Sequence, residues 1–453
     1  MGLPEDRDCA GSFGERIPED LDRAEGLVEE ALLSGAAEAE VYAKTSTTTG
    51  IFLGQGFTTL TGGSERGIAL RVFDGKGSFG HAFWSWADDG RRREMIRAAV
   101  DALKGAVEGP AGRAFPAPRR EEEPARIEGI VDPKVTHWTA EEKRGILEAA
   151  LREASWGRPM GTSATYRDGI SRIALVNSRG LRSGYVRTLS LATLTRAGNG
   201  GPTLHAERVS PGPDPEGLME TALGLARLQP AGGDEEVSWE DLLLESPAAV
   251  SLVRHMLPEL AEDRAAGEGP GESEFRRLAS EAVTVVDDGL LPGGVASAPF
   301  DGEGNPTGRL TLVKAGVRID RFHSPGPNEK GRPGSAVRAS YRDLPGPGGT
   351  NLFVVPGTRP LEEMLRGLKA GFLLAALEGD VREGRSGSAG SRWRGMGWEI
   401  RDGSCVGPCR RLIFRAEPVE LLEGILEVSA RLRFSLRQGV AVGSPDLLIR
   451  RRR

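Results

Sequence analysis

One stretch sets the organisation of this chain: Gly293-Gly294-Val295-Ala296-Ser297-Ala298-Pro299-Phe300-Asp301-Gly302-Glu303-Gly304-Asn305-Pro306-Thr307-Gly308-Arg309. Residues 282–286 before it and 310–319 after it have the apolar patterns of strands, so the stretch is predicted to be the loop between two hairpins. In an extended backbone Asp301 and Glu303 point the same way. The two carboxylates are therefore candidates to bind a cation, to cap backbone N–H groups, or to pair with Arg309.

Length and composition place the chain among globular proteins of enzyme size. It has 453 residues, a net charge of -6 and 63 glycines, which favours two or three domains with many tight turns. A mildly acidic chain argues against a nucleic-acid binder, because such proteins usually expose a basic face. The three cysteines are too few for a disulfide framework, and neither a signal core nor a membrane span is visible. The sequence thus predicts a cytoplasmic protein with no nucleic-acid and no membrane partner.

The order helix, antiparallel strands, helix is predicted twice in the first half of the chain. The first block has helices at 18–34 and 91–106 and strands at 38–44, 50–53, 68–73 and 78–84. The second block has helices at 139–154 and 215–228 and strands at 170–177, 188–195 and 204–209. Thr139 with Glu142 forms a capping box at the start of its helix.

Strand patterns dominate the second half, so the predicted fold class is α+β. We expect an N-terminal α/β region with antiparallel strands flanked by helices, written twice, and a β-rich C-terminal domain. The predicted boundaries are an N-terminal unit at 15–108, a linker at 109–133, a central unit at 134–229 and the C-terminal domain at 238–449. Helices are predicted there at 247–262, from Pro360 and at 418–430, and strands at 352–355, 397–400 and 412–414. The loop 324–349 is long enough to be typical of a functional segment.

The string Pro299-Phe300-Asp301-x-Glu303-Gly304-x-Pro306-Thr307 resembles the signature of the TldD/PmbA family. Thr350–Gly357, Leu361–Leu365 and Arg66–Phe73 are similar to further segments of that family, in the family's order. The resemblance therefore covers nearly the whole chain. It implies one subunit of a two-subunit metallopeptidase of linear peptides, in which a zinc-bearing TldD-like subunit pairs with a metal-free TldE/PmbA-like subunit.

The zinc motif of the family is missing here. The zinc subunit carries His-Glu-x-x-x-His on a helix, whereas the matching segment Glu245–Glu259 has only His255, and Arg433–Pro445 lacks the cysteine that completes the family's metal site. His255 and Glu259 stand one turn apart, but Pro258 between them disturbs the turn and two ligands do not make a zinc site. The resemblance thus implies no cofactor in this chain and zinc in its partner subunit.

The leading hypothesis is a non-catalytic subunit that pairs with a TldD-like zinc subunit as a heterodimer, or forms a homodimer when isolated, and handles unfolded peptides. The alternatives are a stand-alone peptide-binding or scaffold protein, and an independent hydrolase that uses Cys405 or an Asp301/Glu303 metal site. The segment Cys405–Cys409 lies where a hairpin is predicted, which is not the strand, turn and helix of a nucleophile elbow. No catalytic residue is assigned. The candidate groove or interface residues are Phe300, Asp301, Glu303, Asn305, Thr307, Asn351 and Phe353.

Overall fold

The computed structural model describes residues 17–54, 56–76, 78–85, 91–105, 125–155, 161–197, 204–260, 275–322, 334–380, 391–437 and 440–452. Their helices are α1 (Ile17–Leu33), α2 (Arg92–Gly105), α3 (Lys134–His137), α4 (Ala140–Ser155), α5 (Pro215–Ala226), α6 (Ser246–Val253), the 3-10 turn η3 (Arg254–Met256), α7 (Leu257–Leu260), α8 (Leu361–Arg366) and α9 (Pro418–Glu423). None of these helices is long and apolar enough to cross a membrane.

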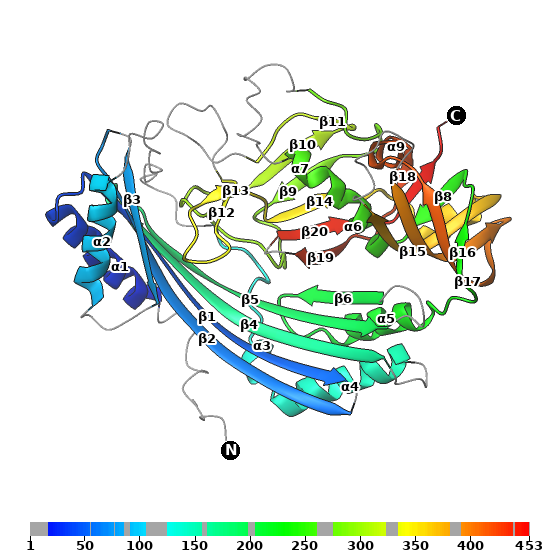
Figure 1. Cartoon of the computed structure of the whole chain (residues 1–453), viewed down its shortest axis with the longest axis horizontal. Helices are drawn as coiled ribbons and strands as arrows, with labels where there is room; N and C mark the ends of the chain where they lie inside the picture. The colour runs from blue at the N-terminus through cyan, green and yellow to red at the C-terminus, as the bar shows by residue number, and fades with distance from the viewer. Residues whose placement is uncertain are drawn as a thin grey trace.

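The strands of the N-terminal half form one antiparallel sheet in the order β3-β2-β1-β4-β5-β6. They are β1 (Glu38–Gly54), β2 (Phe57–Phe73), β3 (Phe79–Ser85), β4 (Thr162–Asn177), β5 (Arg182–Arg196) and β6 (Leu204–Ser210). The two predicted blocks meet where β1 pairs with β4, so they share a single sheet. Its long strands curve strongly, which gives the sheet a convex and a concave face (Figure 1).

The helices of this half pack on the convex face (Figure 1). Helix α1 buries an apolar stripe that includes Leu21, Ala24 and Val28 against the buried Val41 of β1, and it ends before Gly35, whose φ of 102° suits glycine. Helix α4 begins with the predicted capping box, because the backbone N–H groups of Thr139 and Glu142 each reach the other residue's side chain. These contacts leave the concave face to the rest of the chain.

The C-terminal half is β-rich, as predicted, and lies above the concave face (Figure 1). One of its sheets has the order β11-β10-β9-β14-β20-β19, a second has β18-β21-β8-β15-β16-β17-β7, and β12 pairs with β13. The strands are β7 (Asp234–Glu236), β8 (Asp241–Leu244), β9 (Val285–Asp288), β10 (Arg309–Lys314), β11 (Val317–Arg318), β12 (Ala336–Val337), β13 (Gly346–Pro347), β14 (Asn351–Val354), β15 (Ala370–Asp380), β16 (Arg392–Arg401), β17 (Ser404–Arg415), β18 (Ile425–Val428), β19 (Arg433–Arg437), β20 (Val440–Ser444) and β21 (Leu447–Arg450). One core between these sheets includes the fully buried Trp393.

Several predicted elements differ from the structure. The strands expected at 38–44 and 50–53 are one continuous strand, because residues Thr45–Thr49, four of which are β-branched, pair on both sides, with β2 and with β4. The helix expected at 418–430 ends at Glu423, and Ile425–Val428 instead pairs with β21 as a strand. The helix expected at 247–262 is divided into α6, η3 and α7, with Pro258 in the first turn of α7.

Candidate functional site

The loop between β9 and β10 is organised by one buried carboxylate. Asp301 accepts hydrogen bonds from the backbone N–H groups of Glu303 and Asn305, both at 2.9 Å, and from those of Gly334 and Ala336 at 3.0 and 3.1 Å. Burial raises the pKa of Asp301, although these hydrogen bonds act to lower it. Of the three roles predicted for this carboxylate, the structure shows the capping of backbone N–H groups. Arg309 does not pair with it; its guanidinium lies 3.9 Å from Asp288.

Glu303 extends from the same loop toward the concave face of the N-terminal sheet. Its carboxylate lies 4.0 Å from the guanidinium of Arg71 on β2. Arg71 donates hydrogen bonds of 2.9 and 2.8 Å to Glu40 on β1, and Arg338 from the C-terminal half also binds Glu40. Burial acts to raise the pKa of Glu40, but the attraction of the two guanidinium groups outweighs it and the pKa lies below its usual value. This charge cluster joins the two halves of the chain.

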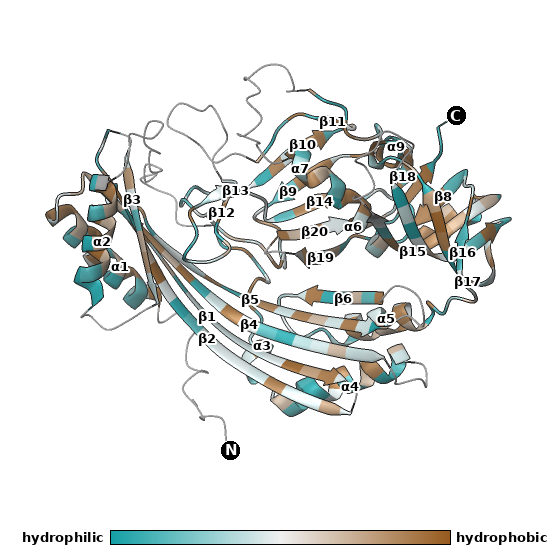
Figure 2. Cartoon of the chain, viewed as in Figure 1, coloured by the Kyte–Doolittle hydropathy of each residue, from teal (hydrophilic) through white to brown (hydrophobic). Residues whose placement is uncertain are grey.

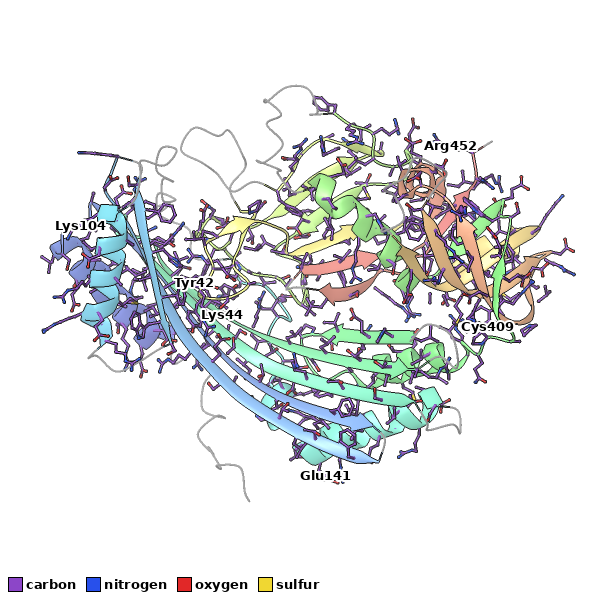
Figure 3. All side chains as sticks on the ribbon, viewed as in Figure 1. Tyr42, Lys44, Lys104, Glu141, Cys409 and Arg452 are labelled. Carbon is purple, nitrogen blue, oxygen red and sulfur yellow. The ribbon has the colours of Figure 1, made fainter. Side chains whose placement is uncertain are left out.

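An aromatic contact adds to this junction. The ring of Phe300 packs edge-on against that of Tyr185 on β5, with 5.0 Å between centroids, in a buried cluster with Tyr42, Leu175 and Tyr341. Asn305 and Thr307 are buried as well, and Thr307 donates to the carbonyl of Ala298. In Figure 3, Tyr42 and Lys44 lie on the side of the sheet that faces the C-terminal half, whereas Glu141 lies on the opposite side.

The remaining two predicted site residues lie on β14. Asn351 is fully buried and donates hydrogen bonds to the carbonyl of Asp288 and to Ser297, at 2.8 and 2.9 Å. Phe353 packs edge-on against Phe434, with 5.7 Å between centroids. All seven predicted side chains are therefore buried within this chain.

The residues present in the described part of the chain do not fit a zinc ion. His255 packs its ring against Trp393, 5.0 Å between centroids, and burial lowers its pKa. The Glu259 carboxylate accepts hydrogen bonds of 3.0 and 3.1 Å from Arg276. Within the described ranges no three His, Cys, Asp or Glu side chains are grouped as metal ligands.

Cys405 and Cys409 lie in the predicted hairpin of β16 and β17, at whose turn Asp402 and Gly403 both have positive φ. Cys405 is exposed overall, and partial desolvation of its thiol, together with the nearby Glu245 carboxylate, raises the pKa of that thiol. Cys409 is buried, and burial raises its pKa to about 11. Because the thiolate is the reactive form, neither environment activates a nucleophile.

The part of the concave face between two of its contacts with the C-terminal half is a feature that the sequence analysis missed. One contact is the cluster around Phe300 and Glu40; at the other, Leu436 of β19 donates a 2.8 Å hydrogen bond to Glu207 of β6. The signal was the run of Thr and Ser residues at 45–49 on β1, with further Thr and Ser residues on β4 and β5. Figure 2 shows these strands with many pale, near-neutral residues.

Comparison with known proteins agrees with this architecture. Residues 241–452 match the family model described as the PmbA/TldA metallopeptidase C-terminal domain. A protein named "Metalloprotease" from Methanothermobacter thermautotrophicus is 23% identical in an alignment 444 residues long, which covers 91% of this chain and 94% of that protein. Over residues 241–452 the chain is therefore similar to the TldD/PmbA family.

Further relatives match this chain over a shorter alignment or at lower identity. The "Metalloprotease TldD homolog" of Buchnera aphidicola subsp. Schizaphis graminum is 24% identical over 189 residues, and the alignment spans only 38% of each protein. The crystal structure of TldE from Thermococcus kodakarensis shares the fold, with a TM-score of 0.79 and 17% identity, over 94% of this chain and 98% of that one.

Proposed function

We propose that this chain is the non-catalytic subunit of a TldD/TldE-type zinc peptidase complex. It pairs with a TldD-like subunit, and the concave face of its sheet forms one wall of the space in which the partner cleaves extended peptides. Zinc belongs to the partner, and the complex works in the cytoplasm. Its own residues bind and position the peptide and hold the wall in shape.

The observation that carries the proposal is the distribution of histidines in a chain that is similar to a metallopeptidase family. The whole sequence has five histidines, and the two that are nearest to each other along the sequence are His205 and His255. The zinc-binding pair of a His-Glu-x-x-x-His helix therefore has no counterpart. The helix that would carry it is divided into three short pieces and ends in residues engaged with Trp393 and Arg276.

The shape of the chain supports the role of a wall. The described helices of the N-terminal half cover the convex face of the sheet (Figure 1), and the C-terminal half is joined to the concave face at Glu40 on β1 and at Glu207 on the edge strand β6. A sheet held in this way presents fixed strands to a peptide. Such a surface admits an extended chain and excludes a folded domain, because only the extended chain can lie along strands.

The deciding experiment measures zinc content and cleavage of an unfolded peptide by the purified chain, alone and mixed with a TldD-like subunit that carries His-Glu-x-x-x-His. We expect no zinc and no cleavage from the chain alone, and chelator-sensitive cleavage after mixing, with comigration of the two subunits in size-exclusion chromatography. Stoichiometric zinc or cleavage by the chain alone would refute the proposal.

The hydrolase alternative has a separate test. If Cys405 were a nucleophile, Cys405→Ser would abolish cleavage in the mixture. We expect this variant to retain full activity, because the pKa of that thiol is raised. A stand-alone peptide-binding protein would instead bind the unfolded peptide and would show no complex with any TldD-like subunit.

A further inference from the structure

The middle of the concave face forms an open strip of side chains that no helix covers in the described part of the chain. Its members are Ser46, Thr48 and Phe52 on β1, Ser163, Thr165, Arg167 and Ser171 on β4, and Arg187, Leu189, Leu191 and Thr193 on β5. Along β4 from Thr162 to Asp168, every second residue is buried, and the residues between them are partly or fully exposed. The exposed set is the one that faces the C-terminal half.

The strip is rich in hydroxyl groups and has few apolar side chains. Ser46 and Ser171 lie opposite each other, with their hydroxyl oxygens 2.9 Å apart. Hydroxyl groups both donate and accept hydrogen bonds, so they suit the amide and carbonyl groups of a peptide backbone of any sequence. A surface that binds the peptide backbone in this way suits a protein that binds peptides of many different sequences.

Two positive charges stand within the strip. Arg167 is exposed and lies opposite Gly50 and Leu191; Arg187 is half-buried and lies opposite Ser171. Neither guanidinium has a carboxylate partner among the residues that the structure describes. The neighbouring acidic groups are already engaged, since Glu207 binds β19 and Glu65 faces Lys44.

We propose that the open strip binds an extended peptide whose acidic side chains pair with Arg167 and Arg187. This rests on the proposed function in one respect, that an extended peptide lies on this face. Guanidinium groups bind carboxylates through two parallel hydrogen bonds, and two unpaired guanidinium groups on one face favour a ligand with carboxylates.

The spacing of the two arginines sets the spacing of the acidic residues. Arg187 pairs across the sheet with Ser171, which is four residues from Arg167 along β4. Four residues of strand span about 13 Å, and side chains four apart in an extended peptide point the same way. The preferred ligand therefore has Asp or Glu at positions i and i+4.

A peptide fits this surface better than a nucleic acid does. A nucleic-acid strand would need a run of positive charges along its phosphates. The strip offers two cations, and Glu65 and Glu207 lie on the same face of the sheet. The whole chain has a net charge of -6, which would also repel a polyanion.

The test is the binding of short fluorescent peptides to the purified full chain alone, followed by fluorescence anisotropy. The probe is an unstructured peptide with two glutamates at i and i+4, compared with the same peptide carrying glutamine at both positions. We expect the glutamate peptide to bind about three-fold or more tighter, and the difference to shrink as NaCl is raised. The double variant Arg167→Gln/Arg187→Gln should bind both peptides equally.

A matched control separates this effect from general charge. Arg152→Gln removes an exposed arginine from α4, on the convex side of the sheet, and should leave the preference intact. Equal affinities of the two peptides for the natural chain would overturn the inference. So would an undetectable interaction with either peptide, a preference that survives the double variant, or tighter binding of a single-stranded oligonucleotide than of the glutamate peptide.

The two proposals fail separately. A preference for acidic peptides without any cleavage after mixing would refute the subunit role and leave this inference standing. Cleavage after mixing, without any preference by the chain alone, would do the reverse.

Discussion

Arg71 on β2 donates two hydrogen bonds to Glu40 on β1, at 2.9 and 2.8 Å, beneath the contact between the two halves of the chain. Both side chains are almost fully buried, and Arg338 from the C-terminal half binds the same carboxylate. A buried ion pair is costly to break, since removal of one member leaves a desolvated charge. The cluster therefore makes the placement of the C-terminal half on the concave face specific.

Arg338→Met should destabilise the chain, because Glu40 would keep only Arg71 as its partner. We expect the free energy of unfolding to fall by about 3 kcal/mol, measured by urea denaturation with tryptophan fluorescence. Arg342→Met is the control: that side chain is exposed and donates to the Tyr341 hydroxyl at 3.1 Å, so its loss should change stability by less than about 1 kcal/mol. Similar losses in the two variants would contradict a special role for the cluster.

Asp301→Ala should lower the stability of the chain about as much as Arg338→Met does, but for a different reason. It would leave the backbone N–H groups of Glu303, Asn305, Gly334 and Ala336 without their acceptor. An unsatisfied buried polar group costs about 1–3 kcal/mol, so we expect a loss of at least about 3 kcal/mol and a lowered Tm in calorimetry. Asp301→Asn keeps one acceptor oxygen and should lose less; an equal loss would show that charge, and not hydrogen bonding, matters.

Two glycines on β2 offer a matched pair. A methyl group on Gly67 would overlap the ring of Tyr341 from the C-terminal half, whereas one on Gly63 would meet nothing closer than 3.9 Å. We expect Gly67→Ala to lower the free energy of unfolding by about 2 kcal/mol, since overpacking forces a well-packed ring to move. Gly63→Ala should change it by less than about 1 kcal/mol. Equal effects in urea denaturation would mean that Tyr341 does not pack closely on the sheet.

Asp287 should make stability depend on pH. Burial raises its pKa to about 7, while hydrogen bonds from the Thr350 backbone and hydroxyl, at 2.8 and 3.0 Å, act to lower it. The native state thus holds a proton that the unfolded state releases near pH 4, so this group's contribution falls as pH rises from about 4 to 7. The slope is about 1.4 kcal/mol per pH unit. Asp287→Asn removes it, and a stability difference between the two proteins that stays constant with pH would contradict the prediction.

Local sequence patterns predicted the longer helices and most strands of the N-terminal half. Helix α1, the capping box of Thr139 and Glu142, and the hairpin around Cys405 were predicted because each depends on residues close in sequence. Short strands such as β8 and β21 were missed, since four residues carry little periodicity and pair only with distant partners. The carboxylates of the stretch Gly293–Arg309 are buried in the protein, which its sequence did not indicate.

The sequence by itself determined the family signature, the absence of the zinc-binding histidine pair and the two repeats of helix and strands. Only the tertiary structure decided that these repeats share one curved sheet, that Glu303 and Phe300 secure the two halves to each other, and that Arg167 and Arg187 face the same open strip. The physical reason is the distance along the sequence over which each kind of interaction acts. Caps and periodicity act over a few residues, whereas strand order, burial and charge pairing depend on residues far apart in the chain.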